Sequence, residues 1–146
     1  MSLEELAAWC EENRSRLCHW FTVDDLMCLK RGGRISAATA LLGTMLQIKP
    51  VIHVDDEGRL VNVAKARGRK ASIDALVSRM GQTQLPGRND TVFICHGDCQ
   101  ADAEYLAQQV KEKFGVKDVL IYYVGAVIGS HSGPGTLALF YLGDHR

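Results

Sequence analysis

The stretch TVFICHGDCQADAEYLAQQVKEKFGVKDVLIYYVG, residues 91–125, determines the fold class of this protein. Its two ends, 91–97 and 119–125, are apolar runs rich in strand-forming residues. A helix is predicted over 101–113, because apolar side chains recur there at helical spacing. Two strands joined by a helix form a right-handed parallel crossover. The segment therefore indicates an α/β domain.

The flanking sequence predicts further strands and helices that would complete a mixed sheet. Capping residues, strand-forming runs and glycine or proline breaks locate them. The expected elements are a helix from the Ser2–Glu5 capping box to about Ser15, a strand over 17–23, a helical turn from Asp24-Asp25 to Gly32-Gly33, a helix from Ser36 to before Pro50, a hairpin of 51–55 with 59–64, a helix ending near Met80, a polar loop over 81–90 and a strand over 136–143. We expect one α/β domain, residues 1–146, with a mixed sheet of about six strands packed with four or five helices.

The composition of the chain excludes several broad classes of protein. Lys plus Arg and Asp plus Glu number 17 each, so the net charge is zero, which argues against general binding to nucleic acid or to a membrane surface. No apolar run approaches the length of a membrane span, and the first residues do not resemble a secretory signal. Five scattered cysteines do not suggest a disulfide framework. We expect a cytoplasmic protein with reduced thiols.

The segment GSHSGPG, residues 129–135, is the most informative candidate site. Three glycines and a proline in seven residues predict a loop held on a fixed path between two strands. Such a loop brings backbone N–H groups close to an anion, and His131 at its centre is able to donate a hydrogen bond to an oxyanion. The alternative is that these residues only shape a turn and that His131 is a surface side chain.

Two basic segments offer further anion contacts. In LKRGGRI, residues 29–35, two arginines flank a glycine pair at a predicted helix end, and guanidinium forks suit carboxylate or phosphate groups. KARGRK, residues 65–70, carries four cations in six residues of a neutral chain. Solvated charge is the plain alternative for both segments. Interleaved aromatic residues, which are typical of single-stranded nucleic-acid sites, are missing from the second.

The run CHGDC, residues 95–99, resembles a metal cluster at first sight. A structural zinc site needs four ligands, typically as two short pairs, and the sequence offers one pair. We expect Cys95 to belong to the core and Asp98 to cap the following helix. No nucleophile with a neighbouring base, no Walker loop and no GxGxxG motif is recognised, so no catalytic residue, metal or cofactor is predicted.

Six segments, read in order, resemble a single known family over nearly the whole chain. They are VDDLMCLKRGGRIS (23–36), LLGTMLQIKPVI (41–52), EGRL (57–60), KARGRK (65–70), HGD (96–98) and IGSHSGPGT (128–136). This ordered set is similar to the C-terminal half of bacterial DegV-family fatty-acid-binding proteins. The resemblance implies two lobes with a fatty acid buried between them, of which this chain is the second. A complete member has about twice this length, so we interpret the sequence as a fragment without its N-terminal lobe.

The resemblance also implies which residues act. Serine and threonine hydroxyls of the N-terminal lobe would contact the carboxylate, and His131 and Arg34 would contact it from this chain. The remaining candidate ligand-binding residues belong to the same glycine-rich loop: Gly129, Ser130, Ser132, Gly133 and Gly135. The loaded protein would carry a long-chain fatty acid to the ATP-binding subunit of a fatty acid kinase, which phosphorylates the carboxylate. Arg67 is the best candidate for contact with that subunit, followed by Arg69 and Arg31.

Two other functions remain open at this stage. An enzyme could use His131 as a general acid or base while Arg34 holds an acidic substrate, although the sequence nominates no second titratable group. An interaction module could act through residues 65–70, and salt-dependent binding to nucleic acid would identify it. For the carrier, half of the tunnel wall is absent from this chain. We therefore expect the isolated lobe to bind fatty acid weakly or not at all, and to self-associate through its exposed cleft face.

Overall fold

One six-stranded sheet organises the protein, and the computed structural model describes residues 1–35 and 48–146 of it. The strands lie in the order β3-β2-β1-β6-β4-β5. Their bounds are β1 Leu17–Thr22, β2 Ile48–Val54, β3 Leu60–Arg67, β4 Thr91–His96, β5 Asp118–Tyr123 and β6 Leu137–Leu142. Only β4 and β5 run parallel among the pairs of this described sheet. The predicted mixed α/β architecture and the parallel crossover over residues 91–125 are therefore confirmed.

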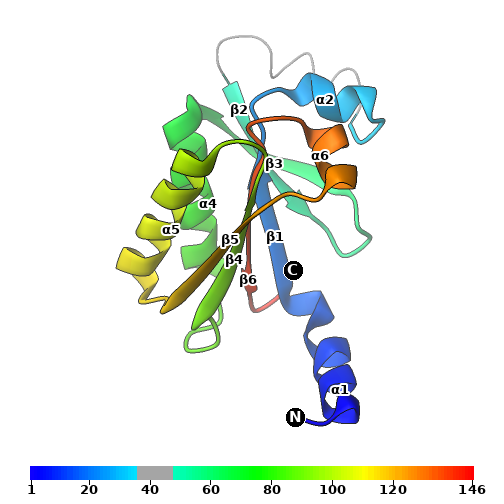
Figure 1. The fold of residues 1–146 in the computed structure, drawn as a ribbon, viewed down its shortest axis with the longest axis vertical. Helices are drawn as coiled ribbons and strands as arrows, with labels where there is room; N and C mark the ends of the chain where they lie inside the picture. The colour runs from blue at the N-terminus through cyan, green and yellow to red at the C-terminus, as the bar shows by residue number, and fades with distance from the viewer. Residues whose placement is uncertain (36–47) are drawn as a thin grey trace.

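Five α-helices and one short 3₁₀ turn accompany the sheet in the described ranges. They are α1 Leu3–Asn13, the 3₁₀ turn Arg14–Arg16, α2 Leu26–Arg31, α4 Arg69–Thr83, α5 Gln100–Phe114 and α6 Ala126–Ser132. Figure 1 shows α4 and α5 side by side on one face of the sheet, while α1 projects from the end of the molecule that is opposite α2 and α6. Residues 36–47 of the small-residue helix expected from Ser36 lie outside the described residues, and its predicted last residues, Ile48 and Lys49, belong to strand β2 instead.

The main core lies between α4, α5 and the sheet. Alternate residues of the central strands point into it, because successive side chains of a strand face opposite sides. Trp20 on β1, Leu139 on β6 and Ile94 on β4 are all buried there. The helices contribute Leu76 and Leu106, both fully buried. This face of the sheet is closed by the chain itself.

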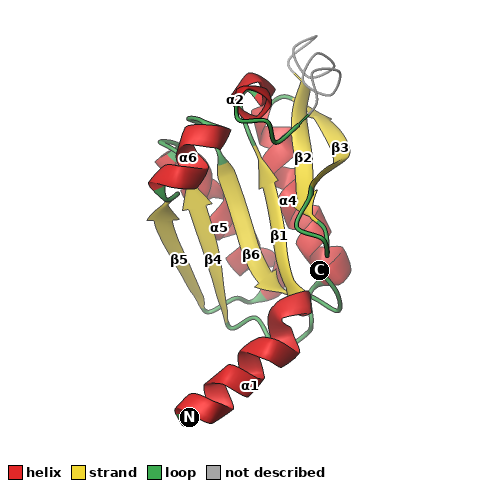
Figure 2. Ribbon diagram, turned by 90° about the vertical axis from the view of Figure 1, so that its right-hand side faces the viewer, coloured by secondary structure: helices red, strands yellow, loops and turns green. Residues whose placement is uncertain are grey.

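The opposite face is covered only at one end. Figure 2 shows α2 and α6 over the upper ends of the strands, with the sheet uncovered below them. Side chains from this face stay accessible in the described structure: Phe93 is 48% exposed and Tyr122 is 63% exposed. None of the described helices is long and apolar enough to cross a membrane.

Several local predictions hold. The Ser2–Glu5 capping box is present, with Glu5 N–H donating to Ser2 Oγ and Ser2 N–H donating to the Glu5 carboxylate. Asp25 caps α2, and the hairpin turns at residues 55–58 as expected. The hairpin strands are longer than predicted, because β2 begins at Ile48 and includes Pro50 instead of following it.

Other local predictions are wrong. The expected loop over 129–135 is helical as far as Ser132, so His131 lies in the last turn of α6. Asp98 does not cap α5: Cys99 occupies the N-cap position, and Asp98 adopts a φ of 54° in the tight turn before it. Helix α4 runs on to Thr83, past the Met80 and Gly81 that were expected to end it.

Candidate functional site

A hollow of about 450 Å³ lies where α2 and α6 meet the open face of the sheet. Its volume falls within the range of about 300–1,000 Å³ that is typical of small-molecule pockets. Mostly apolar side chains line it, contributed by β1, β4, β6, the β2–β3 hairpin and α6; they include Phe21, Phe140, Ala138, Leu60, Val127 and Ile128. Both His131 and Arg34 also line it. The two residues singled out by the sequence therefore share one cavity.

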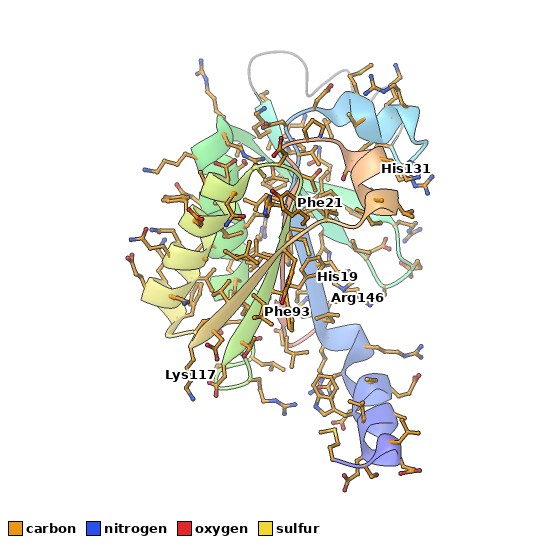
Figure 3. All side chains as sticks on the ribbon, viewed as in Figure 1. His19, Phe21, Phe93, Lys117, His131 and Arg146 are labelled. Carbon is orange, nitrogen blue, oxygen red and sulfur yellow. The ribbon has the colours of Figure 1, made fainter. Side chains whose placement is uncertain are left out.

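Cross-strand pairing builds the floor of this hollow. Phe21 on β1 pairs with Ala138 on β6, and Ala138 pairs in turn with Cys95 on β4. Two residues further along each strand, on the same face, His19 pairs with Phe140, and their rings meet edge to face at 5.3 Å between centroids. Figure 3 shows His19 and Phe21 in the middle of the molecule, between His131 at the α6 end and Phe93 further down the sheet.

The glycine pair after α2 serves two different purposes. Gly33 has φ of +70°, and its N–H donates to Lys30 O while the Arg34 N–H donates to Leu29 O. These two bonds form a Schellman motif, which ends a helix through a left-handed residue, and glycine adopts that conformation without strain. The motif leads directly into Arg34, which is exposed and whose guanidinium donates to Gly32 O at 2.7 Å.

Gly32 is required for another reason, because it lies against the imidazole of His131. A β-carbon at Gly32 would stand 2.5 Å from Nδ1 of His131. A side chain there would push α2 and α6 apart. The lack of a side chain at position 32 thus sets how closely His131 approaches the segment that carries Arg34.

The serine hydroxyls of α6 donate their hydrogen bonds to backbone carbonyls of the same helix. Ser130 Oγ donates to Val127 O and Ser132 Oγ donates to Ile128 O, both at 2.8 Å. Ser132 is buried at the wall of the hollow, whereas Ser130 is exposed and does not line it. Gly129, Gly133 and Gly135 also stand outside the lining and shape the backbone around His131. As ligand-binding residues, these five stay predictions.

Cys95 lines the hollow, and the expectation that it belongs to the core is wrong. Its strand is covered on one side only, and Cys95 points to the uncovered side with Phe93. Burial raises the pKa of the Cys95 thiol, which favours the neutral thiol over the nucleophilic thiolate. Among the described residues, no group of three or more His, Cys, Asp or Glu side chains is placed to hold a metal ion.

The basic residues fall into two groups. Arg67 and Arg31 are exposed, at the end of β3 and the end of α2. Arg69 is drawn inward at the start of α4, where its side chain is only 19% exposed and its Nε lies 2.7 Å from Asp102 Oδ2. The three arginines therefore differ in burial, a difference that the charge pattern of the sequence does not show.

His19, Phe21 and Phe140 are among the residues of the hollow that sequence reasoning overlooked. A signal for the first two was available in the strand over 17–23. Cys18 and Trp20 alternate there with His19 and Phe21, so one set had to face away from the core. What the alternation could not show is that α2 and α6 close over that second face.

Known proteins resemble this chain along its full length. The family model described as "Uncharacterised protein, DegV family" matches residues 1–144. A DegV domain-containing protein of Clostridium perfringens is 52% identical over 145 residues, which is 99% of this chain and 50% of that protein. The chain thus spans about half the length of this curated relative.

Solved structures share the fold. A structure described as fatty acid binding of a DegV family protein from Thermus thermophilus is 32% identical and superposes with a TM-score of 0.80, covering 98% of this chain and 51% of that one. The Streptococcus pneumoniae Fatty Acid Kinase (Fak) B3 protein, loaded with linoleic acid, superposes with a TM-score of 0.87 over 99% of this chain and 50% of that one. At 20% identity, the second likeness speaks for the fold alone.

Proposed function

The chain belongs to the DegV family, and from this premise we propose that it is the head-group lobe of a fatty-acid carrier. In this proposal His131 and Arg34 hold the carboxylate at the mouth of the hollow, and the acyl chain lies on the floor formed by Phe21, Ala138 and Phe140. The single observation that carries the proposal is that a His and an Arg line the same, otherwise mostly apolar, cavity. The fatty-acid-binding relative from Thermus thermophilus, at 32% identity, supports the choice of ligand.

The energetics suit a ligand with a long apolar tail. Burial of about a dozen methylenes at ~0.8 kcal/mol each gives on the order of 10 kcal/mol before ordering costs. A hydrogen bond to a charged head group adds about 1.5–3 kcal/mol. The tail therefore dominates the affinity, and the two polar side chains determine which end of the lipid faces outward.

A second lobe is part of the proposal. The uncovered half of the sheet exposes Phe93, Leu120 and Tyr122, which is more apolar surface than a finished carrier is expected to leave in water. The relatives are about twice as long as this chain, which provides a covering lobe of the required size. Residues 1–146 then act as one domain of a two-lobed protein.

The proposed role of the bound lipid is presentation to a kinase subunit. Arg34 keeps a carboxylate ionised by its charge, and an ionised carboxylate is the form that attacks a phosphoryl donor. Phosphoryl transfer depends mainly on positioning and charge, so a carrier that fixes the head group performs much of the required work. Arg67 and Arg31 are exposed and available to contact an acidic surface on the kinase subunit. Because that subunit uses ATP, we place the complex in the cytoplasm.

An acid–base enzyme is the competing function. In the described part of the hollow, the other ionisable side chains are His19 and Cys95. Burial lowers the pKa of His19 and raises that of Cys95, so both favour their neutral forms. Neither side chain supplies the charged partner that His131 would need as a general acid or base. The hollow therefore fits a carrier better than an acid–base enzyme.

The test uses the full-length two-lobed protein. Organic extraction followed by mass spectrometry is expected to release one long-chain fatty acid per molecule, and addition of ATP and the kinase subunit is expected to yield acyl phosphate. His131→Ala and Arg34→Ala should keep the lipid but lower the rate of acyl phosphate formation about 100-fold. A protein without lipid, or variants that lose lipid and rate in equal measure, would contradict the proposal.

A further inference from the structure

Arg69 and Asp24 stand out because they form ion pairs next to the glycine-proline turn but do not line the hollow. Asp24 follows β1, and its carboxylate lies 2.9 Å from Lys49 Nζ, which also donates to the Asp24 carbonyl oxygen at 2.9 Å. Arg69 Nη1 lies 3.6 Å from the same carboxylate, and Arg69 Nε lies 2.7 Å from Asp102. Positive and negative groups thus alternate in a row: Lys49, Asp24, Arg69 and Asp102.

This row touches the turn of residues 133–136 at Gly135. A β-carbon at Gly135 would run into the Asp24 carboxylate, and the φ of +77° at this position also favours glycine. The Gly135 N–H donates to Gly97 O at 2.6 Å, and the Gly97 N–H donates to Thr136 O at 2.8 Å. The turn is therefore held between the end of β4 and the side chain of Asp24.

Arg69 reaches the same turn by a second route. Its Nη2 donates to Cys99 Sγ at 3.4 Å, and Cys99 Sγ donates to Thr136 O at 3.3 Å. Burial raises the pKa of Cys99, which keeps the thiol proton available for this bond. One guanidinium thus supports the turn through Asp24 on one side and through Cys99 on the other.

The turn of residues 133–136 follows the end of α6, one residue after His131. The Gly133 N–H donates to Gly129 O, which closes the last turn of α6, and Thr136 Oγ1 donates to Gly133 O at 2.7 Å. On its other side the imidazole rests against Gly32. A shift of residues 133–136 is therefore expected to move His131 relative to Arg34, because the Gly133 N–H bond to Gly129 O and the Thr136 Oγ1 bond to Gly133 O tie the turn to the last turn of α6.

We propose that Arg69 and Asp24 are positioning residues that hold the turn behind His131, and that Arg69 is not a contact for the kinase subunit. The inference rests on the proposed function and assigns a different role to each arginine of the basic stretch. Arg67 is left exposed for the partner, whereas the guanidinium of Arg69 lies between two carboxylates of the protein: its Nε donates to Asp102, and its Nη1 lies 3.6 Å from Asp24, an ion pair without a hydrogen bond within the described residues. A planar fork that bridges two carboxylates is not replaced by the single ammonium of lysine, whereas a docking charge is.

The experiment compares Asp24→Asn, Arg69→Met and Arg69→Lys in the full-length protein with its kinase subunit. The measured quantities are the fatty acid load, kcat and KM for the carrier in acyl phosphate formation, and the ¹H–¹⁵N signals of the His131 imidazole. Lys117→Ala is the control, because it removes an exposed ion pair with Asp90 at the end of the molecule remote from His131 (Figure 3).

Asp24→Asn and Arg69→Met are expected to keep their lipid and their KM within about twofold, to lower kcat about tenfold, and to shift the His131 signals, because small misplacements of a reacting group are costly. Arg69→Lys should recover only part of the loss. Lys117→Ala should match the unmodified protein. Urea unfolding identifies a variant that does not fold, and the remaining two then decide the result.

Other outcomes overturn the inference. If Arg69→Met raises KM without changing kcat, and Arg69→Lys has the KM of the unmodified protein, Arg69 is a docking residue. Unchanged His131 signals in Asp24→Asn would show that the ion pairs do not hold the turn. If the unmodified protein carries no lipid or yields no acyl phosphate, the proposed function fails, and the His131 signals still report whether Asp24 and Arg69 position the imidazole.

Discussion

The two faces of the sheet carry neighbouring residues of the same strands, yet they are built for different purposes. On the covered face, Leu139 pairs with Trp20 and Ile94, and Leu139 and Ile94 have no exposed surface. On the open face, Ala138 pairs with Phe21 and Cys95, and these side chains line a hollow. Alternation along a strand thus lets one set of side chains stabilise the fold while the other set stays accessible, and in the proposed function this second set meets the ligand and the second lobe.

The largest expected difference between the two faces is in the free energy of unfolding, when a side chain of the covered core is shortened. Leu139→Ala leaves a cavity between α4, α5 and the sheet, and should lower the free energy of unfolding by about 2–5 kcal/mol. Phe93→Ala is the counterpart on the open face, where the ring is already 48% exposed. It should lower the free energy of unfolding by no more than about 1 kcal/mol. Urea denaturation of both variants measures the difference, and equal losses would mean that the open face is also part of the stabilising core.

A smaller effect is expected where α2 and α6 close one end of the open face. Gly32→Ala places a methyl group against the His131 ring, and overpacking of this kind lowers stability by about 1–3 kcal/mol. Gly125→Ala is the matched control, because its β-carbon meets nothing within 4 Å and its φ of −59° suits any residue. Thermal unfolding and the His131 imidazole signals report both effects. A Gly32→Ala protein that resembles the control would mean that α2 and α6 are free to separate.

The open face should also govern self-association of the isolated lobe. Phe93→Glu adds a charge to the exposed apolar surface and is expected to weaken dimer formation about tenfold, or about 1.4 kcal/mol. Gln108→Glu adds the same charge on exposed α5, behind the covered face, and should leave association unchanged. Sedimentation at several concentrations distinguishes them. Equal weakening by both changes would point to net charge instead of the open face.

The sequence was informative where local rules are strong. The crossover over residues 91–125 follows from apolar runs and helical spacing, and the glycine pair at 32 and 33 correctly ends α2. The shared hollow of His131 and Arg34 followed from a family resemblance and from no spacing rule. It required two segments almost a hundred positions apart to meet, which periodicity does not report.

The failures have physical causes outside local sequence. Glycine and serine disfavour helices, so residues 129–132 read as a loop, but packing of α6 against α2 at Gly32 outweighs that weak preference. Cys95 lies in an apolar run that continues on both sides of β4, so the run does not show that one side is uncovered. Arg69 has the same charge as Arg67, and only the fold brings Asp24 and Asp102 beside it.

The smallest expected effect is a change in how stability depends on pH, and it involves one histidine on each face of the sheet. His19 faces the hollow, whereas His53 stacks on the core residue Trp20 at 4.3 Å between centroids. The Nε2 atom of each is buried and has no hydrogen-bond partner within the described residues. Burial lowers the pKa of both below the ordinary value of 6.5, with a further contribution from the positive charge of Arg146.

These shifts make the lobe slightly sensitive to acid. Well above pH 6.5, His19 and His53 are neutral in both the folded and the unfolded chain, and their contribution to stability is complete. As the pH falls below that value, the unfolded chain binds protons that the folded lobe resists, so the free energy of unfolding declines. His19→Gln and His53→Gln should each flatten part of this decline, measured by urea denaturation at several pH values.

Ligand loading distinguishes the two histidines. An acyl chain on the floor of the hollow buries His19 further, so the pKa of His19 should fall again on loading, while that of His53, outside the hollow, should not change. Titration of the imidazole signals in the loaded and empty full-length protein provides the measurement, with the two Gln variants assigning the signals. A rise in the pKa of His19 would mean that a carboxylate lies beside it. The head group would then sit at β1, in the middle of the sheet, and the orientation proposed for the lipid would have to be reversed.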